Sequence, residues 1–130
     1  MIHVMDSSAL LAVSKGEVGA DEVIELMQSQ DCVISSVNMA EVATRLLDMG
    51  LPPEHLDRAC RQFGLDVIDF NHEQAGACAA LRPLTKSAGL SLGDRACLAL
   101  TKLMQGTAVT ADHAWQDVKA VVDVPIIQIR

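Results

Sequence analysis

Hydrophobic residues along the chain fall into two kinds of segment, which predict strands and helices respectively. Short unbroken apolar runs are typical of strands that are buried on both faces of a parallel sheet. These runs lie at Ile2–Met5, residues 32–35, residues 65–68, Thr107–Thr110 and residues 124–129. Because proline cannot donate a backbone hydrogen bond, Pro125 restricts the last run to an edge strand or to the start of a strand.

Longer segments repeat their apolar residues every three or four positions, which indicates helices with one buried face. The pattern predicts helices over residues 8–13, Ala20–Ser29, residues 37–49, 53–63, 71–80 and 91–104. Pro83 would break or restart the chain after the fifth of these helices. Strands that alternate with helices predict an α/β fold, in which helices cover both faces of a mostly parallel sheet. We expect a single domain over residues 1–130.

Composition indicates a folded chain and narrows its class. Half of the 130 residues are hydrophobic and 21% are charged, which argues against disorder. The net charge of −7 argues against a broad basic patch for nucleic acid, although phosphate binding through bound cations stays open. Four cysteines, Cys32, Cys60, Cys78 and Cys97, lack zinc-ligand spacing and predict free thiols in a reducing compartment. With no signal peptide and no apolar run of membrane-spanning length, we expect a cytoplasmic protein without a membrane partner.

Four acidic residues recur where a predicted strand ends or a helix begins. Asp6 directly follows the first strand, and Asp112 lies two residues beyond the fourth. Glu41 lies in the first turns of the helix after the second strand, and Asp94 begins the helix over residues 91–104. Open α/β sheets bind ligands outside the carboxyl ends of their strands, so these acids are expected on one rim. Clustered carboxylates repel one another unless cations are present, and oxygen ligands suit Mg²⁺ or Mn²⁺.

Each acid also has a local explanation. Asp6 alone is explained by hydrogen bonds from the N–H groups of the next helical turn. Glu41 is explained by a capping arrangement with Asn38 or by an ion pair with Arg45. Asp94 is explained by a capping box that starts at Ser91. Asp112 is explained as the cap of a last short helix.

Four motifs together carry a family resemblance. In chain order they are VMDSSALLA, SSVNMAEVA, LSLGDRACLAL and AVTADHAW. They resemble the motifs of PIN-domain ribonucleases and, more closely, those of VapC-type toxins from toxin–antitoxin pairs. The resemblance implies a three-layer α/β/α PIN-like domain around a central, mostly parallel sheet of four to five strands. It places the catalytic acidic quartet of the family on Asp6, Glu41, Asp94 and Asp112.

The same resemblance implies an endoribonuclease that depends on Mg²⁺ or Mn²⁺ and cleaves RNA such as tRNA or ribosomal RNA. It also implies a cognate antitoxin protein and a homodimer. Bound cations would activate a water for in-line attack on the scissile phosphate. Asp6 and Asp94 are the expected direct metal ligands, and Asp112 and Glu41 would complete the cage or bind through water.

Further residues are assigned to supporting roles. The hydroxyls of Ser7, Ser8 and Thr110 would orient the carboxylates from behind. RNA contact would fall to cations near the rim, with Arg45 and Arg95 as the main candidates besides Arg82 and Lys86. Asp117 and His113 could join the site but also fit a solvated helix residue and an exposed turn residue. Trp115 is expected in the core.

Two other classes of protein fit parts of the pattern. A catalytically silent α/β interaction module would have the same fold, with every acid acting as a cap. A phosphoacceptor signalling domain also carries acids at strand ends, but it would have an acidic pair early and a lysine just after a late strand. Asp6 is solitary and Lys119 lies far beyond Thr110, which disfavours the signalling domain.

Overall fold

A five-stranded parallel sheet forms the centre of the computed structural model, which describes all residues 1–130. The strands are β1 (Ile2–Met5), β2 (Asp31–Ser35), β3 (Asp66–Ile68), β4 (Thr107–Thr110) and β5 (Ile126–Gln128). Their spatial order is β3-β2-β1-β4-β5, and every neighbouring pair is parallel. All five predicted strands are present. Pro125 directly precedes the edge strand β5, as the missing N–H of proline requires.

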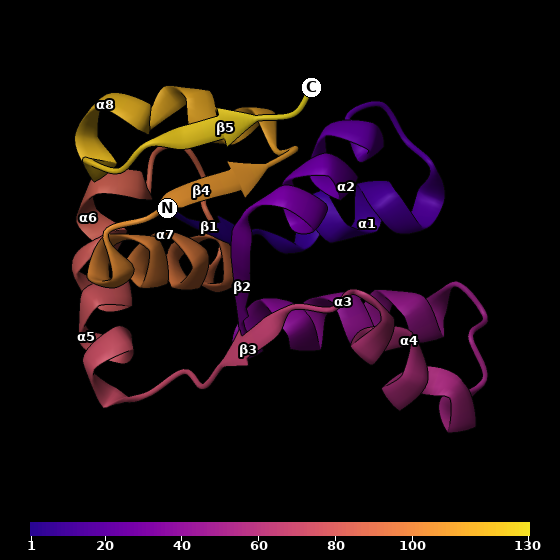
Figure 1. Ribbon diagram of the computed structural model, residues 1–130. Helices are drawn as coiled ribbons and strands as arrows, with labels where there is room; N and C mark the ends of the chain where they lie inside the picture. Colours follow the sequence, from indigo (N-terminus) through magenta and orange to yellow (C-terminus); the bar gives the residue numbers. More distant parts are fainter.

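Helices cover both faces of this sheet and give three layers (Figure 1). One face carries α1 (Ser7–Lys15), α2 (Ala20–Ser29), α3 (Ser36–Asp48) and α4 (Leu56–Gln62). The other carries α5 (His72–Ala80), α6 (Arg82–Thr85), α7 (Leu92–Met104) and α8 (Lys119–Val122). This arrangement confirms the predicted α/β/α fold. None of these helices has the length and apolar character needed to cross a membrane.

Two short 3₁₀ helices account for the main differences from the predicted helices. The helix expected over residues 53–63 is divided into η1 (Pro53–His55) and α4. Pro53 suits a first turn because a first-turn N–H has no partner inside the helix, and the 3₁₀ turn that it begins passes directly into α4 at Leu56. After β4, η2 (His113–Asp117) precedes α8. Pro83 lies in the first turn of α6, so it restarts the helix.

Two hydrophobic cores lie on opposite faces of the sheet. Successive residues of a strand point to opposite faces, so Val4 belongs to the core under α5 and α7 while Met5 belongs to the core under α1 and α3. The same alternation explains why the strands read as unbroken apolar runs. Trp115 is fully buried in the first core, which confirms its predicted place.

The order of the strands determines where a ligand can enter. The chain moves from β1 to β2 on one side of the centre, whereas β4 lies beside β1 on the other side. Such a reversal opens a crevice at the carboxyl ends of the two central strands. Asp6 follows β1 and Thr110 ends β4, so both lie at this crevice. The backbone N–H of Asp6 donates to the Val109 carbonyl across it, at 2.9 Å.

Candidate active site

Asp6 lies at the centre of the candidate site and is only 2% exposed. It occupies the position before α1 with extended backbone, but its carboxylate accepts no hydrogen bond from a backbone N–H of the helix. The explanation of Asp6 as a helix cap is therefore wrong. Its Oδ2 instead accepts hydrogen bonds from Ser8 Oγ at 2.6 Å and from Thr110 Oγ1 at 2.9 Å.

The backbone of the loop after β4 orients these two hydroxyls. Ser8 Oγ accepts from the N–H of Ala111 at 2.9 Å, and Thr110 Oγ1 accepts from the N–H of Asp112 at 3.0 Å. Each hydroxyl has a single hydrogen, which the structure directs to Asp6. The carboxylate is thus held through Oδ2 by residues more than one hundred positions apart in the sequence.

The second oxygen of Asp6, Oδ1, is buried and has no hydrogen-bond partner. Burial raises the pKa of Asp6 to about 7, although the hydrogen bonds from Ser8 and Thr110 act to lower it. The negative charges of Asp94 and then Glu41 contribute to the same rise in pKa, each by less than burial does. The structure therefore brings three of the four predicted acids into electrostatic contact.

Glu41 is held by a neighbour on its own helix. Asn38 Nδ2 donates to Glu41 Oε1 at 3.0 Å and to the carbonyl of Gly93, at the start of α7, also at 3.0 Å. The suggested ion pair of Glu41 with Arg45 is absent. The two ion pairs of the chain join other residues. Asn38 contacts Glu41 as suggested, but it is not a cap: Ser35 caps α3 instead.

Asp94 forms the predicted capping box at the start of α7. Its Oδ2 accepts from the N–H of Ser91 at 2.8 Å, and its own N–H donates to Ser91 Oγ at 3.2 Å. The capping box occupies Oδ2 alone. The preceding residue, Gly93, lies against Glu41 so closely that a Cβ atom there would overlap the Glu41 carboxylate.

Asp112 is the least integrated of the four acids. Its Oδ1 accepts from the N–H of Ala114 at 2.9 Å, so it caps η2 as the local explanation suggested. Its charge is not among those that raise the pKa of Asp6. The connection between these two acids runs through the Thr110 hydroxyl.

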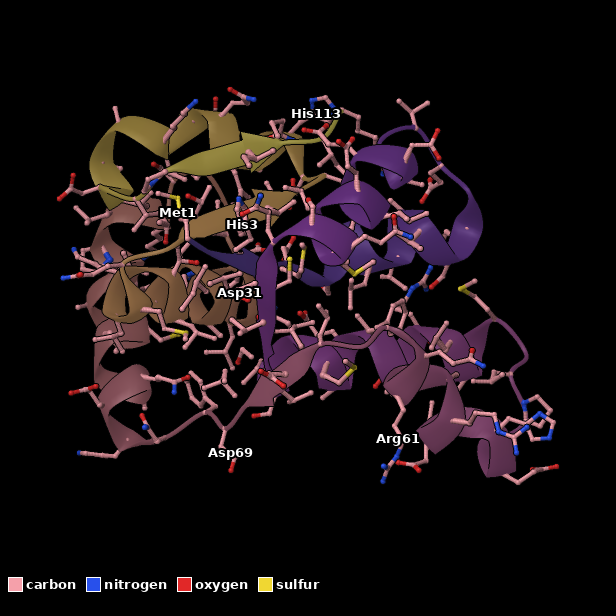
Figure 2. The ribbon with its side chains drawn as sticks, in the orientation of Figure 1. Met1, His3, Asp31, Arg61, Asp69 and His113 are labelled. Atoms are coloured by element: carbon pink, nitrogen blue, oxygen red, sulfur yellow. The ribbon has the colours of Figure 1, made fainter.

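Several residues that were assigned supporting roles lie apart from this group. The Ser7 hydroxyl makes no hydrogen bond to Asp6, whereas those of Ser8 and Thr110 do. Asp117 and His113 are exposed, and His113 lies at the outer surface in Figure 2. The sequence signal for Asn38 was its spacing three residues before Glu41, which suggested a local cap and not its contact with α7.

The cationic candidates differ in their surroundings. Arg45 is exposed and lines an open groove of about 560 Å³ between α3 and α7, together with Glu41 and Gly93. Arg95 is partly buried, and its Nη1 donates to the carbonyl of Cys78 in α5 at 3.2 Å. Arg45 is therefore available to a ligand beside the acids, while Arg95 ties two helices together.

The donor set fits a divalent cation. Asp6, Glu41 and Asp94 supply hard carboxylate oxygens, and the unpartnered Oδ1 of Asp6 lacks the positive charge or donor that a buried carboxylate requires. No three acidic, histidine or cysteine side chains approach closely enough to form a complete cage. Mg²⁺ does not require one, because it is usually held by one or two carboxylates and keeps several waters.

Solved structures with the same fold come from toxin–antitoxin systems. A toxin–antitoxin complex from Klebsiella pneumoniae has 19% identity and a TM-score of 0.77, with 98% of each chain covered. The DNA-bound VapBC complex of Salmonella typhimurium has 16% identity and a TM-score of 0.75, with 100% of this chain and 99% of that chain covered. VapC20 of Mycobacterium tuberculosis, a toxin that cleaves the sarcin–ricin loop, has 15% identity and a TM-score of 0.70, covering 96% of this chain and 100% of that chain. Identity this low shows the shared fold alone.

Sequence comparison shows the family directly. No curated protein matches the chain in sequence. The family model described as PIN domain, however, matches residues 4–121, which include all four acids, the end of β1 and the whole of β2, β3 and β4. This chain belongs to the PIN domain family.

Proposed function

We propose that this chain is a divalent-metal-dependent endoribonuclease and the toxin of a toxin–antitoxin pair. The observation that carries the proposal is the Asp6 carboxylate, which is buried, held through Oδ2 and unpartnered at Oδ1. The charges of Glu41 and Asp94 act on the same carboxylate. Such an arrangement destabilises the metal-free chain and is relieved by a bound cation.

Asp6, Glu41 and Asp94 would hold the cation, with Asp112 close by through Thr110. When bound, Mg²⁺ or Mn²⁺ would polarise the scissile phosphate and lower the pKa of a bound water below that of free water. The chain contributes orientation: Ser8 and Thr110 fix Oδ2 of Asp6 and leave Oδ1 free as a ligand. Burial of Asp6 excludes the bulk water that would otherwise screen its charge.

The RNA backbone would enter through the groove between α3 and α7. Arg45 is exposed in this groove beside Glu41, and its guanidinium suits a phosphate of the strand that flanks the scissile bond. A net charge of −7 means that binding relies on the cation and on such local contacts. Arg95 contributes less in this proposal because its guanidinium already contacts α5.

The relatives of the same fold support the remaining parts of the proposal. VapC20 cleaves the sarcin–ricin loop, which favours structured RNA as the substrate class. The Klebsiella pneumoniae and Salmonella typhimurium structures are toxin–antitoxin complexes, which favours a cognate antitoxin for this chain. Sedimentation of the purified chain, alone and with the antitoxin, would test both this partner and the proposed homodimer.

Cleavage of RNA by the purified chain tests the proposal. A tRNA mixture and a hairpin with the sarcin–ricin loop are incubated with Mg²⁺ or Mn²⁺, and in parallel with EDTA. We expect cleavage that EDTA abolishes and that Asp94→Asn reduces by at least 100-fold. Ser91→Ala is the matched control, because it weakens the capping box around Asp94 by about 1 kcal/mol but keeps the Asp94 charge. Cleavage that survives both EDTA and Asp94→Asn would refute the metal-dependent nuclease.

The caps formed by Asp94 and Asp112 favour one alternative, a silent interaction module with the same fold. This alternative predicts that Mn²⁺ does not change the melting temperature of the native chain. It predicts the same for the variant that combines Asp6→Asn with Asp94→Asn. A rise in melting temperature with Mn²⁺ in the native chain alone separates the nuclease from the silent module.

A further inference from the structure

Asn38 bridges the two helices that carry Glu41 and Asp94. It lies in the first turn of α3, is fully buried, and donates through one amide nitrogen to both Glu41 Oε1 and the Gly93 carbonyl. Both partners are acceptors, so the amide can face them only with its nitrogen. Its oxygen is left buried without a hydrogen-bond partner.

A buried amide of this kind is costly if it serves packing alone. An unpartnered buried acceptor destabilises the folded state, and an apolar side chain of similar size would avoid that loss. The two bonds that the nitrogen does make join a charged carboxylate to the backbone one residue before Asp94. The contacts of this amide therefore indicate that it fixes the position of the Glu41 carboxylate.

Gly93 completes the contact from the side of α7. A Cβ atom at this position would overlap the carboxylate of Glu41, which supplies its three nearest atoms. A larger residue here therefore has to displace the Glu41 carboxylate. The position of Glu41 thus requires glycine at position 93. The backbone does not require it, because it is ordinary helix here.

Electrostatics explain why Glu41 needs to be held. Without a cation, the charges of Asp6 and Glu41 repel each other, which favours displacement of the Glu41 side chain toward solvent. A hydrogen bond from an amide to an ionised carboxylate opposes this displacement. We propose that Asn38 and Gly93 are positioning residues that keep the Glu41 carboxylate beside Asp94 and Asp6, so that a divalent cation finds its ligands already placed. This inference rests on the proposed metal-dependent function.

Gly93→Ala is the sharpest test, with Mn²⁺ affinity of the purified chain measured by titration calorimetry in the absence of RNA. Loss of an orienting contact behind a metal ligand typically weakens metal affinity about 10- to 100-fold, and we expect a loss in this range. The melting temperature should stay the same or rise, because alanine is favoured over glycine inside helices. Gly76→Ala in α5 is the matched control, since nothing lies within 4 Å of its added Cβ. It should leave Mn²⁺ affinity unchanged.

Asn38→Ala tests the other side of the contact. We expect a similar loss of Mn²⁺ affinity, and little further loss when the change is combined with Glu41→Gln, because Asn38 acts through Glu41. Gln74→Ala is the matched control: Gln74 is also a buried amide with one bond to a backbone carbonyl and an unpartnered oxygen. It should lower the melting temperature but not the Mn²⁺ affinity.

The outcomes distinguish this inference from the proposed function. If the native chain does not bind Mn²⁺, both are refuted. If the native chain binds Mn²⁺ while Gly93→Ala and Asn38→Ala bind it equally well, only the positioning role is refuted. Additive losses from Asn38→Ala and Glu41→Gln would also refute it, because they indicate general destabilisation. If Asn38→Ala does not fold, Gly93→Ala alone decides the matter.

Discussion

Replacing Asp6 by asparagine should stabilise the metal-free chain, and by more at high pH than at low pH. Asparagine keeps an acceptor for Ser8 and Thr110 and has nearly the same size. Its amide nitrogen would take the place of the unpartnered oxygen and would face acids instead of adding to their charge. The change thus removes a buried charge without removing the hydrogen bonds that hold the side chain.

The magnitude follows from the pKa of Asp6, which burial above all raises from 3.8 to about 7. Each tenfold change in an ionisation constant corresponds to about 1.4 kcal/mol, so ionised Asp6 costs the folded state about 4 kcal/mol. Between pH 4 and pH 7 the folded state keeps a proton that the unfolded state has released. The free energy of unfolding therefore falls as pH rises through this range, and the loss is complete above pH 7.

Urea denaturation at pH 5 and pH 8 measures this effect, with EDTA present throughout. The chain has one tryptophan, Trp115, and it is fully buried, so its fluorescence reports unfolding. At pH 5 the cost of Asp6 is about 2 kcal/mol, so the advantage of Asp6→Asn should grow by about 2–3 kcal/mol between pH 5 and pH 8. The difference between the two pH values cancels any change in packing.

Asp69→Asn is the matched control, because Asp69 also directly follows a strand, β3, but is exposed and points away from the protein in Figure 2. Like Asp6→Asn, it removes one negative charge from the chain, but it leaves the buried carboxylate of Asp6 unchanged. Equal pH dependence of the native chain and Asp6→Asn would refute the reasoning. At pH 8, Mn²⁺ at 100 times its dissociation constant should restore about 2.7 kcal/mol to the native chain and nothing to Asp6→Asn.

Two further predictions concern the surroundings of this carboxylate. Thr110→Val removes the donor to Asp6 and the acceptor for the Asp112 N–H, so it should destabilise the chain by about 1–3 kcal/mol, and more at pH 8 than at pH 5 in urea denaturation; an equal loss at both pH values would contradict it. Cys97 is fully buried, and burial together with the Asp6 charge raises its thiol pKa well above the usual value. Maleimide at pH 8 should therefore modify the partly exposed Cys60 long before Cys97, as peptide mass spectrometry would show; labelling of both at one rate would contradict the burial.

The sheet was predictable because its signal is local. In a parallel sheet with helices on both faces, each strand is a short apolar run, and all five runs of the sequence became strands. The caps at Asp94 and Asp112 were equally predictable, since their partners lie two or three residues away. Sequence spacing therefore predicts a contact well when both partners lie within one turn of the chain.

The contacts that define the site are not of this kind. Thr110 and Asp6 are 104 positions apart, and Asn38 and Gly93 are 55 positions apart. Spacing within α3 offered Arg45 as the partner of Glu41, but packing of α3 on α7 places Gly93 against the Glu41 carboxylate instead. The sequence therefore predicted that the acids lie on one rim, whereas only the fold shows which of them act electrostatically on Asp6.

A cap and a metal ligand are not exclusive roles for a carboxylate, because it has two oxygens. Asp94 uses Oδ2 for its capping box and Asp112 uses Oδ1 for η2, so each retains an oxygen that no backbone group occupies. Asp6 divides its oxygens in the same way, with long-range hydroxyls in place of a helix turn. The local explanations and the proposed site therefore describe different oxygens of the same residues. Asparagine distinguishes the two roles: it keeps the accepting oxygen that a cap needs, but it loses the charge and puts an amide nitrogen where the second oxygen would bind a cation.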